Sequence, residues 1–217
     1  MTQGQAILRL RGVGLVLNRS TILRDVNADL LEREVVGVVG ANGSGKTTLL
    51  RIIATLLPAT AGSVEVLNHD RTGFRRIRDQ IELIGHTPAL YPELTLRENL
   101  AFVTKLAGRA SALVDRHLIT VGLSAAADRR ADRSSHGMQR RIEFARALIR
   151  EPQLLLLDEA HAGLDADARG LVDHVIEDVR ARNGAVVMVS HEADRMTGSA
   201  TRIVQLAGGT IMAGEAG

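Results

Sequence analysis

The sequence predicts an α/β fold in which a mainly parallel sheet is flanked by helices. Apolar runs of strand length, among them 35–39, 154–157 and 185–189, alternate with amphipathic stretches of helix length. A glycine-rich turn directly follows the first of these runs. Alternation of this kind is typical of parallel sheets, because each crossover connection lays a helix on one face of the sheet.

The composition is that of one sizeable domain, residues 1–217, with its own core. Hydrophobic residues make up 45% of the chain and aromatic residues only 2%, so Leu, Ile, Val and Ala must build most of the core. The sequence has no cysteine, which excludes disulfides and thiolate metal sites. No apolar run approaches the ~20 residues that span a bilayer, and the first residues lack the apolar stretch of a signal peptide. We therefore expect a soluble chain that reaches a membrane only through a partner.

The charge of the chain does not favour nucleic acid as a partner. The formal net charge is +2, and Lys46 and Lys105 are the only lysines, so the basic side chains are almost all arginine. Nucleic-acid binding is typically marked by a strongly basic patch with a reading motif. We expect scattered, solvated arginines instead.

The predicted elements follow the hydrophobic pattern along the chain. Strands are expected at residues 7–10, 15–17, 22–31, 35–39, 62–67, 81–85, 154–157, 185–189, 202–206 and 210–213. Helices are expected at residues 96–106, 110–121, 137–149 and 166–181, and directly after the glycine-rich turn. This last helix should end at Pro58 and bury one broad apolar face formed by Leu49, Leu50, Ile52, Ile53 and Leu56. The mostly helical block at roughly 88–150 lies between two strands of the sheet and predicts an inserted helical subdomain.

The glycine-rich turn predicts a phosphate-binding loop. Residues 40–47 fit G-x-x-x-x-G-K-[ST], directly after a predicted strand and at the start of a helix. Glycines let successive N–H groups curl around phosphate oxygens, and the helix adds its positive end. Lys46 can reach the β- and γ-phosphates, and the Thr47 hydroxyl can bind Mg²⁺. The candidate nucleotide-binding residues are Gly40, Asn42, Gly43, Ser44, Gly45, Lys46, Thr47 and Thr48. The competing interpretation is a chance glycine turn before a helix.

Two acidic residues, Asp158 and Glu159, end the predicted strand at 154–157. Catalytic groups in open α/β sheets gather at the carboxyl ends of strands. Asp158 can hold Mg²⁺ there, and Glu159 can act as general base on the attacking water. The alternative is a strand end capped by two solvated acids. With the phosphate loop, the pair predicts a P-loop NTPase core.

A third motif gives the chain a family resemblance. Residues 134–141 read Ser-Ser-His-Gly-Met-Gln-Arg-Arg and lead into a predicted helix, shortly before the acidic strand. The chain resembles the nucleotide-binding subunits of ABC transporters over essentially its whole length. This implies an N-terminal antiparallel β subdomain, and a signature motif in which Ser135, Gly137 and Met138 contact the ATP held by an opposite subunit. The start of a helix is an anion-binding end; the alternative is an ordinary capped helix with Ser135 as N-cap.

The resemblance implies further residues and partners. Asp165, in Gly-Leu-Asp, matches the D-loop that crosses the dimer interface, and His191 matches the switch histidine that contacts the γ-phosphate. The implied cofactors are ATP and Mg²⁺. The implied partners are a second copy or a homologous ATPase subunit, and an integral membrane permease that holds the protein on the inner, cytoplasmic face of the membrane.

The chain departs from the family pattern at four positions. His86 replaces the usual glutamine, and a neutral imidazole can still bind metal or donate a hydrogen bond, so we expect a catalytic and metal role there. Leu17 replaces the aromatic residue that stacks on adenine, which leaves only apolar contact. Ala160 replaces a proline, and His136 adds bulk in the signature. We expect activity, though slow.

Finer features are similar to one branch of the family. Gly85-His86, with segments 90–95 and 98–102, is similar to the heme-exporter subunit of cytochrome c maturation. We expect the permease to dock near Leu90 and Tyr91, where the alternative is a plain loop before a helix. A second functional hypothesis is a nucleotide-gated module that dimerises with ATP but barely hydrolyses it. A DNA-repair or translation ATPase is disfavoured, because the chain has neither a long coiled-coil insertion nor a second cassette.

Overall fold

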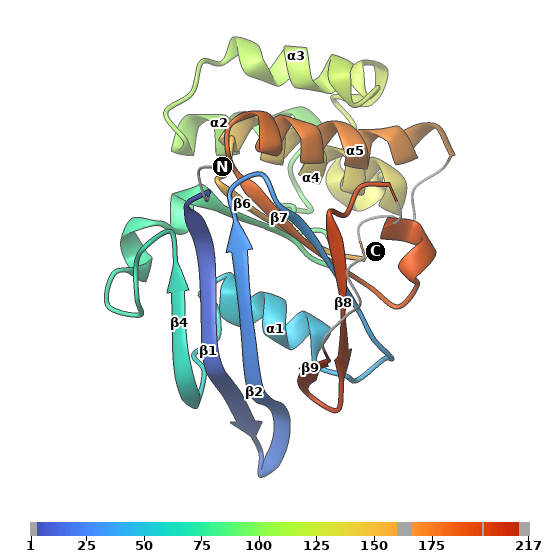
Figure 1. The fold of residues 1–217 in the computed structure, drawn as a ribbon. Helices are drawn as coiled ribbons and strands as arrows, with labels where there is room; N and C mark the ends of the chain where they lie inside the picture. The colour runs from blue at the N-terminus through green and yellow to red at the C-terminus, as the bar shows by residue number, and fades with distance from the viewer. Residues whose placement is uncertain (1–3, 160–165, 197, 213–217) are drawn as a thin grey trace.

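The computed structural model describes residues 4–159, 166–196 and 198–212, and it confirms the predicted α/β class (Figure 1). The strands are β1 (Ala6–Leu17), β2 (Ser20–Leu31), β3 (Val35–Val39), β4 (Ala61–Val66), β5 (Ile81–Ile84), β6 (Leu154–Asp158), β7 (Ala185–Ser190), β8 (Arg202–Ala207) and β9 (Thr210–Met212). The α-helices are α1 (Lys46–Ile53), α2 (Leu96–Leu106), α3 (Ala112–Thr120), α4 (His136–Arg150) and α5 (Ala166–Ala181). Short 3₁₀ helices lie at Phe74–Arg76, Arg78–Gln80, Ser124–Ala126, Ala131–Arg133 and Ala193–Met196.

The larger sheet has the strand order β5-β6-β7-β3-β8-β9. Every neighbouring pair in it is parallel except β8 and β9 at one edge. Val38, in the middle of β3, pairs with Val189 on one side and Val204 on the other. Because β6, β7 and β3 are adjacent and parallel, their carboxyl ends lie side by side at one edge of the sheet.

The smaller sheet is antiparallel, with the order β2-β1-β4. The predicted break between residues 10 and 15 is wrong, because β1 runs through it as one strand with irregular register. Gly12 has φ 60°, and a Cβ built on Gly62 would lie 2.3 Å from the Gly12 carbonyl oxygen. This close backbone approach at a bulge interrupts the two-residue periodicity from which the strand was predicted.

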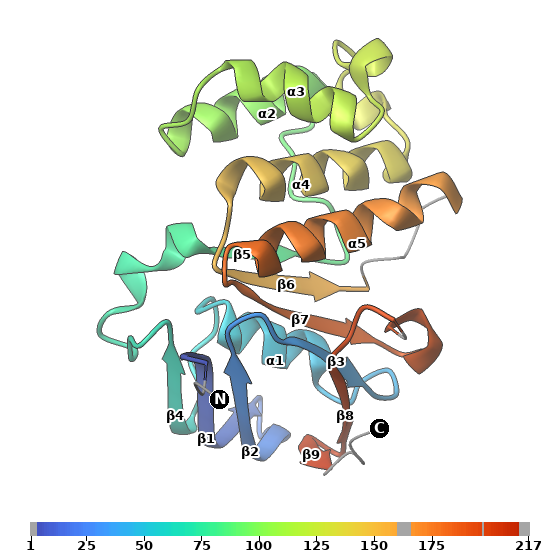
Figure 2. The same cartoon turned by 45° about the horizontal axis from the view of Figure 1, so that its top comes forward.

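The core has separate layers on the two faces of the larger sheet. Leu154 and Leu156 of β6 pack toward α1 and the antiparallel sheet, whereas Leu155 and Leu157 pack toward α4 and α5. Figure 2 shows α4 and α5 on one side of the larger sheet, and α1 between the two sheets. All four leucines are fully buried, and each contributes roughly 2 kcal/mol through its burial.

Helix α1 buries most of its predicted apolar face but is shorter than expected. Leu49, Leu50, Ile52 and Ile53 are 1% exposed or less. Leu56 is 63% exposed, so its predicted place on this face is wrong. The helix ends at Ile53, and the chain turns through Thr55 at φ 61°, before Pro58 is reached.

Helices α2, α3 and part of α4 form a third layer with its own apolar cluster, which includes Leu100, Leu118 and Ile142. A capping box starts α2: the Thr95 side chain accepts the Glu98 N–H at 3.1 Å, and Glu98 Oε2 accepts the Thr95 N–H at 2.8 Å. Both bonds satisfy N–H groups that a helix start leaves free, so the sequence itself fixes where α2 begins.

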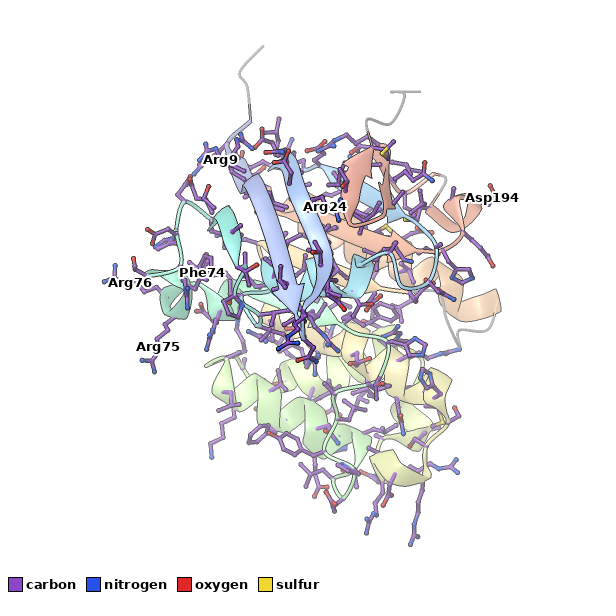
Figure 3. All side chains as sticks on the ribbon, turned by 90° about the horizontal axis from the view of Figure 1, so that it is seen from below. Arg9, Arg24, Phe74, Arg75, Arg76 and Asp194 are labelled. Atoms are coloured by element: carbon purple, nitrogen blue, oxygen red, sulfur yellow. The ribbon has the colours of Figure 1, made fainter. Side chains whose placement is uncertain are left out.

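Arginines lie on the outer surface between β4 and β5. Arg75 and Arg76 are exposed and project away from this segment (Figure 3). Within the described residues, no helix has both the length and the apolar character needed to cross a membrane.

Candidate active site

The loop from Gly40 to Lys46 joins the carboxyl end of β3 to the start of α1. Gly43 and Gly45 have φ values of 81° and 103°, in the region that favours glycine. A Cβ on Gly40 would lie 2.3 Å from the Leu206 carbonyl oxygen, so only glycine lets the loop approach β8 this closely. The two sheet strands and α1 therefore fix the course of the loop.

Lys46 is buried inside this loop, with 7% of its surface exposed. Its Nζ donates hydrogen bonds to the carbonyl oxygens of Gly40 at 2.6 Å and Ala41 at 3.0 Å. The Ser44 hydroxyl is also buried and has no hydrogen-bond partner among the described residues. Positive charge, the start of α1 and a hydroxyl thus lie together in one curve of the chain, an arrangement that fits an anionic ligand. Asn42 and Thr47 of the predicted set are exposed, and Thr48 is half-buried.

Asp158 ends β6 and Glu159 follows it, at the same edge of the sheet as this loop, with the end of β7 between them. Asp158 is 4% exposed, and its carboxylate accepts no hydrogen bond from another described residue. Glu159 has φ 53°, a conformation that costs a residue other than glycine about 1–3 kcal/mol. Its N–H donates to the Val189 carbonyl oxygen at 3.0 Å, which ties the turn to β7.

The Glu159 carboxylate is held by the residues that end β7. Its Oε1 lies 2.9 Å from His191 Nδ1 and accepts the His191 N–H at 3.0 Å. Its Oε2 accepts the Ser190 hydroxyl at 3.2 Å. His191 Nε2 lies 3.1 Å from Glu192 Oε1, and a neutral imidazole donates from one nitrogen only, so donation to both carboxylates requires the protonated ring. The structure therefore brings the predicted acid and the predicted histidine together.

The predicted signature residues form the exposed start of α4. Ser135 is the N-cap, and its Oγ accepts the Met138 N–H at 3.2 Å. Ser135 and His136 are exposed and Gly137 is half-buried, so this helix start is not covered by its own chain. The Met138 side chain packs against the apolar cluster of the helical layer. A partner could reach Ser135 and the main chain of Gly137, and the exposed helix start is compatible with the in-trans role that the sequence predicts.

Other predicted positions are not gathered at this centre. His86 is exposed just beyond β5. Among the described residues, no group of three or more His, Cys, Asp or Glu side chains comes together as a metal site would require. Leu17 ends β1 and is 42% exposed. Asp165 and Ala160 lie outside the described residues, and the roles of all four remain predictions.

A buried pair on α4, Arg140 and Glu143, is not predicted from the sequence. Both side chains are fully buried, and Arg140 Nη1 lies 3.2 Å from Glu143 Oε2. Arg140 also donates to the main chain of Gly85, Asp158 and Glu159. The available signal was opposite charges at i,i+3, with apolar Ile142 and Phe144 beside Glu143 but polar Gln139 and Arg141 beside Arg140.

The comparisons with known proteins decide the family. A family model described as "ABC transporter" matches residues 23–162. The chain belongs to the ABC transporter family. Membership confirms the predicted ABC-type ATPase, with a P-loop core and an antiparallel N-terminal sheet.

This ABC ATPase is similar to several ATP-binding proteins of bacterial transporters. It is 38% identical to the zinc import ATP-binding protein ZnuC of Cereibacter sphaeroides over 87% of this chain and 74% of that protein. It is 33% identical to the ABC transporter ATP-binding protein YdbJ of Bacillus subtilis over 96% of this chain and 69% of that protein. With the spermidine/putrescine import ATP-binding protein PotA of Lawsonia intracellularis it shares 31% identity, but it spans only 59% of that protein's length.

Two solved structures with 25% sequence identity to this ABC ATPase have a similar fold. An ATP-binding subunit of an ABC transporter superposes with a TM-score of 0.88, over 95% of this chain and 88% of that one. The ATP-binding cassette MJ0796, solved as a dimer in a post-hydrolysis state with ADP and Pi, superposes with a TM-score of 0.85 over 95% of this chain and 97% of that one. None of the three named relatives above carries heme in its name, so the heme-exporter resemblance remains a hypothesis.

Proposed function

We propose that this ABC ATPase hydrolyses MgATP at composite sites between two copies of the chain, and thereby drives an integral membrane permease. One observation carries the proposal: the Glu159 carboxylate, fixed by His191 and Ser190, lies at the sheet edge from which the Lys46 loop also begins. A general base and a phosphate-binding loop at one edge are what phosphoryl transfer to water requires.

Each residue of this edge has a proposed role. Lys46 and the N–H groups of its loop bind the β- and γ-phosphates, and Leu17 offers apolar contact to the adenine. The Thr47 hydroxyl and the buried Asp158 carboxylate would hold Mg²⁺, because oxygen atoms are the ligands this ion prefers. The Asp158 carboxylate fits this role, since no described residue donates a hydrogen bond to it. When bound, Mg²⁺ neutralises charge on the phosphates.

Glu159 accepts a proton from the attacking water, and His191 and His86 donate toward the phosphate or the water.

The second copy would complete each site. The exposed N-terminus of α4, with Ser135, would face the γ-phosphate held by the opposite Lys46 loop. Helix N-termini stabilise anions through free N–H groups and the helix dipole. Asp165, proposed to cross the dimer interface, lies outside the described residues.

A groove between the helical layer and the larger sheet is the proposed docking site of the permease. Its volume is about 540 Å³, and Arg78 and Arg146 line it together with apolar side chains. Tyr91 and Phe102 meet edge to face there with ring centroids 5.0 Å apart, and both are exposed. Arg146 is already paired with Glu82, whereas Arg78 is exposed. A cytoplasmic helix of the permease, with apolar side chains for the groove and an acidic one for Arg78, would fit this surface. Such docking would hold the protein at the cytoplasmic face of the membrane.

The most specific statement we propose is the identity of the transported compound. The residues around His86 and segment 90–95 support heme export for cytochrome c maturation, although ZnuC and PotA are named for import of other compounds. A heme-permease gene beside this gene would support heme export. A neighbouring permease for a different compound would count against it.

The experiment compares turnover of MgATP by the full chain and by Lys46→Ala, with and without the membrane partner. We expect turnover only with Lys46. A second arm tests the dimer: Glu159→Gln should bind ATP, hydrolyse it slowly and elute as a dimer in gel filtration. A protein that dimerises with ATP but shows no more turnover than Lys46→Ala would be the nucleotide-gated module instead.

A further inference from the structure

We propose that Arg140 is a positioning residue for ATP hydrolysis, which locks the main chain of Glu159 to the loop that follows β5. Arg140 lies on α4, two residues after the Ser135–Met138 turn, of which Ser135 and His136 are exposed, and its side chain is fully buried. Among the described residues, none of its hydrogen bonds reaches the Lys46 loop or the first turn of α4. Its effect on the reaction would therefore pass through Glu159.

The contacts of Arg140 join two segments that are far apart in sequence. Nη2 donates to the carbonyl oxygens of Asp158 and Glu159, both at 3.1 Å. Nη1 donates to the carbonyl oxygen of Gly85, directly after β5, and to Glu143 Oε2 at 3.2 Å. One planar guanidinium thus ties the turn that follows β6 to the turn that follows β5. Its fork can serve both segments at once, which a single ammonium group cannot do in the same way.

The Glu159 turn needs an anchor of this kind. The residue adopts φ 53°, which is unfavourable for a side chain with a Cβ unless the surroundings enforce it. Its N–H is fixed to the Val189 carbonyl oxygen at 3.0 Å, and its carbonyl oxygen is fixed to Arg140. Since both sides of the residue are held, the carboxylate stays within reach of His191 and Ser190.

Stability alone is a poor explanation for this arrangement. Arg140 is fully buried, and its Nε has no hydrogen-bond partner among the described residues. Burial raises the pKa of Glu143, against the opposing effects of the Ala89 N–H, Arg146 and Arg140. Buried ion pairs are often no more stable than apolar replacements of similar volume, so a buried pair with many main-chain contacts is better explained by positioning.

Glu143 extends the same anchor along the loop after β5. Its Oε1 accepts the Ala89 N–H at 2.9 Å, and Arg146 Nη1 donates to the Ala89 carbonyl oxygen at 2.9 Å. Arg146 and Arg150 in turn bind Glu82 of β5, each at 2.7 Å. One face of α4 therefore fixes β5 and the loop beyond it, and Arg140 is the member of this network that reaches Glu159.

The inference rests on the proposed role of Glu159 as general base, and the experiment separates the two claims. The full chain is assayed with MgATP as wild type, Arg140→Met, Arg140→Lys and Glu159→Gln. The matched control is Arg180→Met. Arg180 lies on α5, binds Glu177 three residues away and donates to the Arg33 carbonyl oxygen at 3.0 Å. Neither of these contacts involves Glu159.

We expect Arg140→Met to lower kcat by about 10- to 100-fold, the loss typical of a slightly misplaced catalytic group, with little change in KM for ATP. Arg140→Lys should recover part of kcat, and Arg180→Met should keep all of it. Wild-type kcat in Arg140→Met, with Glu159→Gln inactive, would overturn the positioning role alone. Full turnover in Glu159→Gln would instead overturn the role of Glu159. If Arg140→Met does not fold, Arg140→Lys decides: a lowered kcat with unchanged KM and melting temperature supports the proposal, and an unchanged kcat refutes it.

Discussion

Glu159 and His191 meet through two hydrogen bonds to one oxygen atom: Oε1 of Glu159 accepts the main-chain N–H of His191 at 3.0 Å and lies 2.9 Å from its Nδ1. The glutamate follows β6 and the histidine follows β7, so the contact joins two neighbouring strand ends. The Ser190 hydroxyl binds the second carboxylate oxygen. With both oxygens bound, the orientation of the carboxylate is fixed, and this favours a base that must point at one water molecule.

Replacing His191 with alanine should lower kcat by about 100-fold, in the range typical of a lost acid–base or orienting group. The Lys46 loop is untouched, so KM for ATP should change little. Steady-state kinetics with MgATP measure both constants. His174→Ala, at an exposed position of α5, is the control and should behave as wild type. Equal activity of the two variants would remove His191 from the mechanism.

Ser135→Ala should impair turnover without weakening ATP binding to the isolated monomer. The loss of an N-cap should also cost about 1 kcal/mol of stability. Thr95→Ala is a matched control, because Thr95 caps α2 by the same kind of bond but lies outside the proposed composite site. Both variants should lose similar stability in chemical unfolding, and only Ser135→Ala should lose turnover. A large drop in monomer affinity would argue that Ser135 acts within its own chain.

Gly40→Ala should weaken ATP binding and destabilise the fold by about 1–3 kcal/mol, as overpacked sites do. The new Cβ would lie 2.3 Å from the Leu206 carbonyl oxygen and 2.7 Å from Ser44 Oγ. The comparison is Gly170→Ala on α5, where a Cβ meets nothing within 4 Å. That variant should gain about 0.5–1 kcal/mol from better helix propensity. Thermal unfolding distinguishes the two, and a neutral Gly40→Ala would mean that the loop is not held against β8.

Stability should fall as the pH drops below about 6.5, the ordinary pKa of histidine, in part because of His117. Burial lowers the pKa of His117, Arg116 and His174 lower it further, and Asp178 and Glu151 oppose them. The unfolded chain then binds a proton more readily than the folded one, so the contribution is present above that pH and is lost below it. His117 Nδ1 is also buried without a hydrogen-bond partner among the described residues.

The measurement is the melting temperature at pH 7.5 and pH 5.5 for wild type and His117→Gln. The substitution should reduce the difference between the two values. An unchanged difference would show that other groups cause the whole effect.

The motifs and the sheet could be predicted from the sequence because their signals are local. The strand, glycine turn and helix around Lys46 follow one another along the chain, and β6 ends with its two acids in one uninterrupted run. Parallel pairing with β7 then places the carboxyl ends of β3 and β6 at the same edge of the sheet. The contact between Glu159 and His191 depends on β6 and β7 being neighbours in the sheet. No single segment of the sequence specifies that order.

Features that depend on contacts between distant segments were harder to predict from the sequence. The bulge at Gly12 depends on the approach of Gly62, a partner from another strand. The early end of α1 depends on the turn at Thr55, where no proline or glycine marks the stop. Arg140 was visible as one more arginine in a basic stretch, and only the packed structure shows that it is buried against the main chain of Glu159.

The ring pair in the groove gives the molecule a built-in optical probe. Tyr91 is the only tyrosine in a sequence without tryptophan, and it contacts Phe102 at an exposed site. Tyrosine fluorescence therefore arises from this one location, remote from the Lys46 loop along the chain. A binding protein that covers the groove would alter the tyrosine signal directly, so association could be followed without any attached dye.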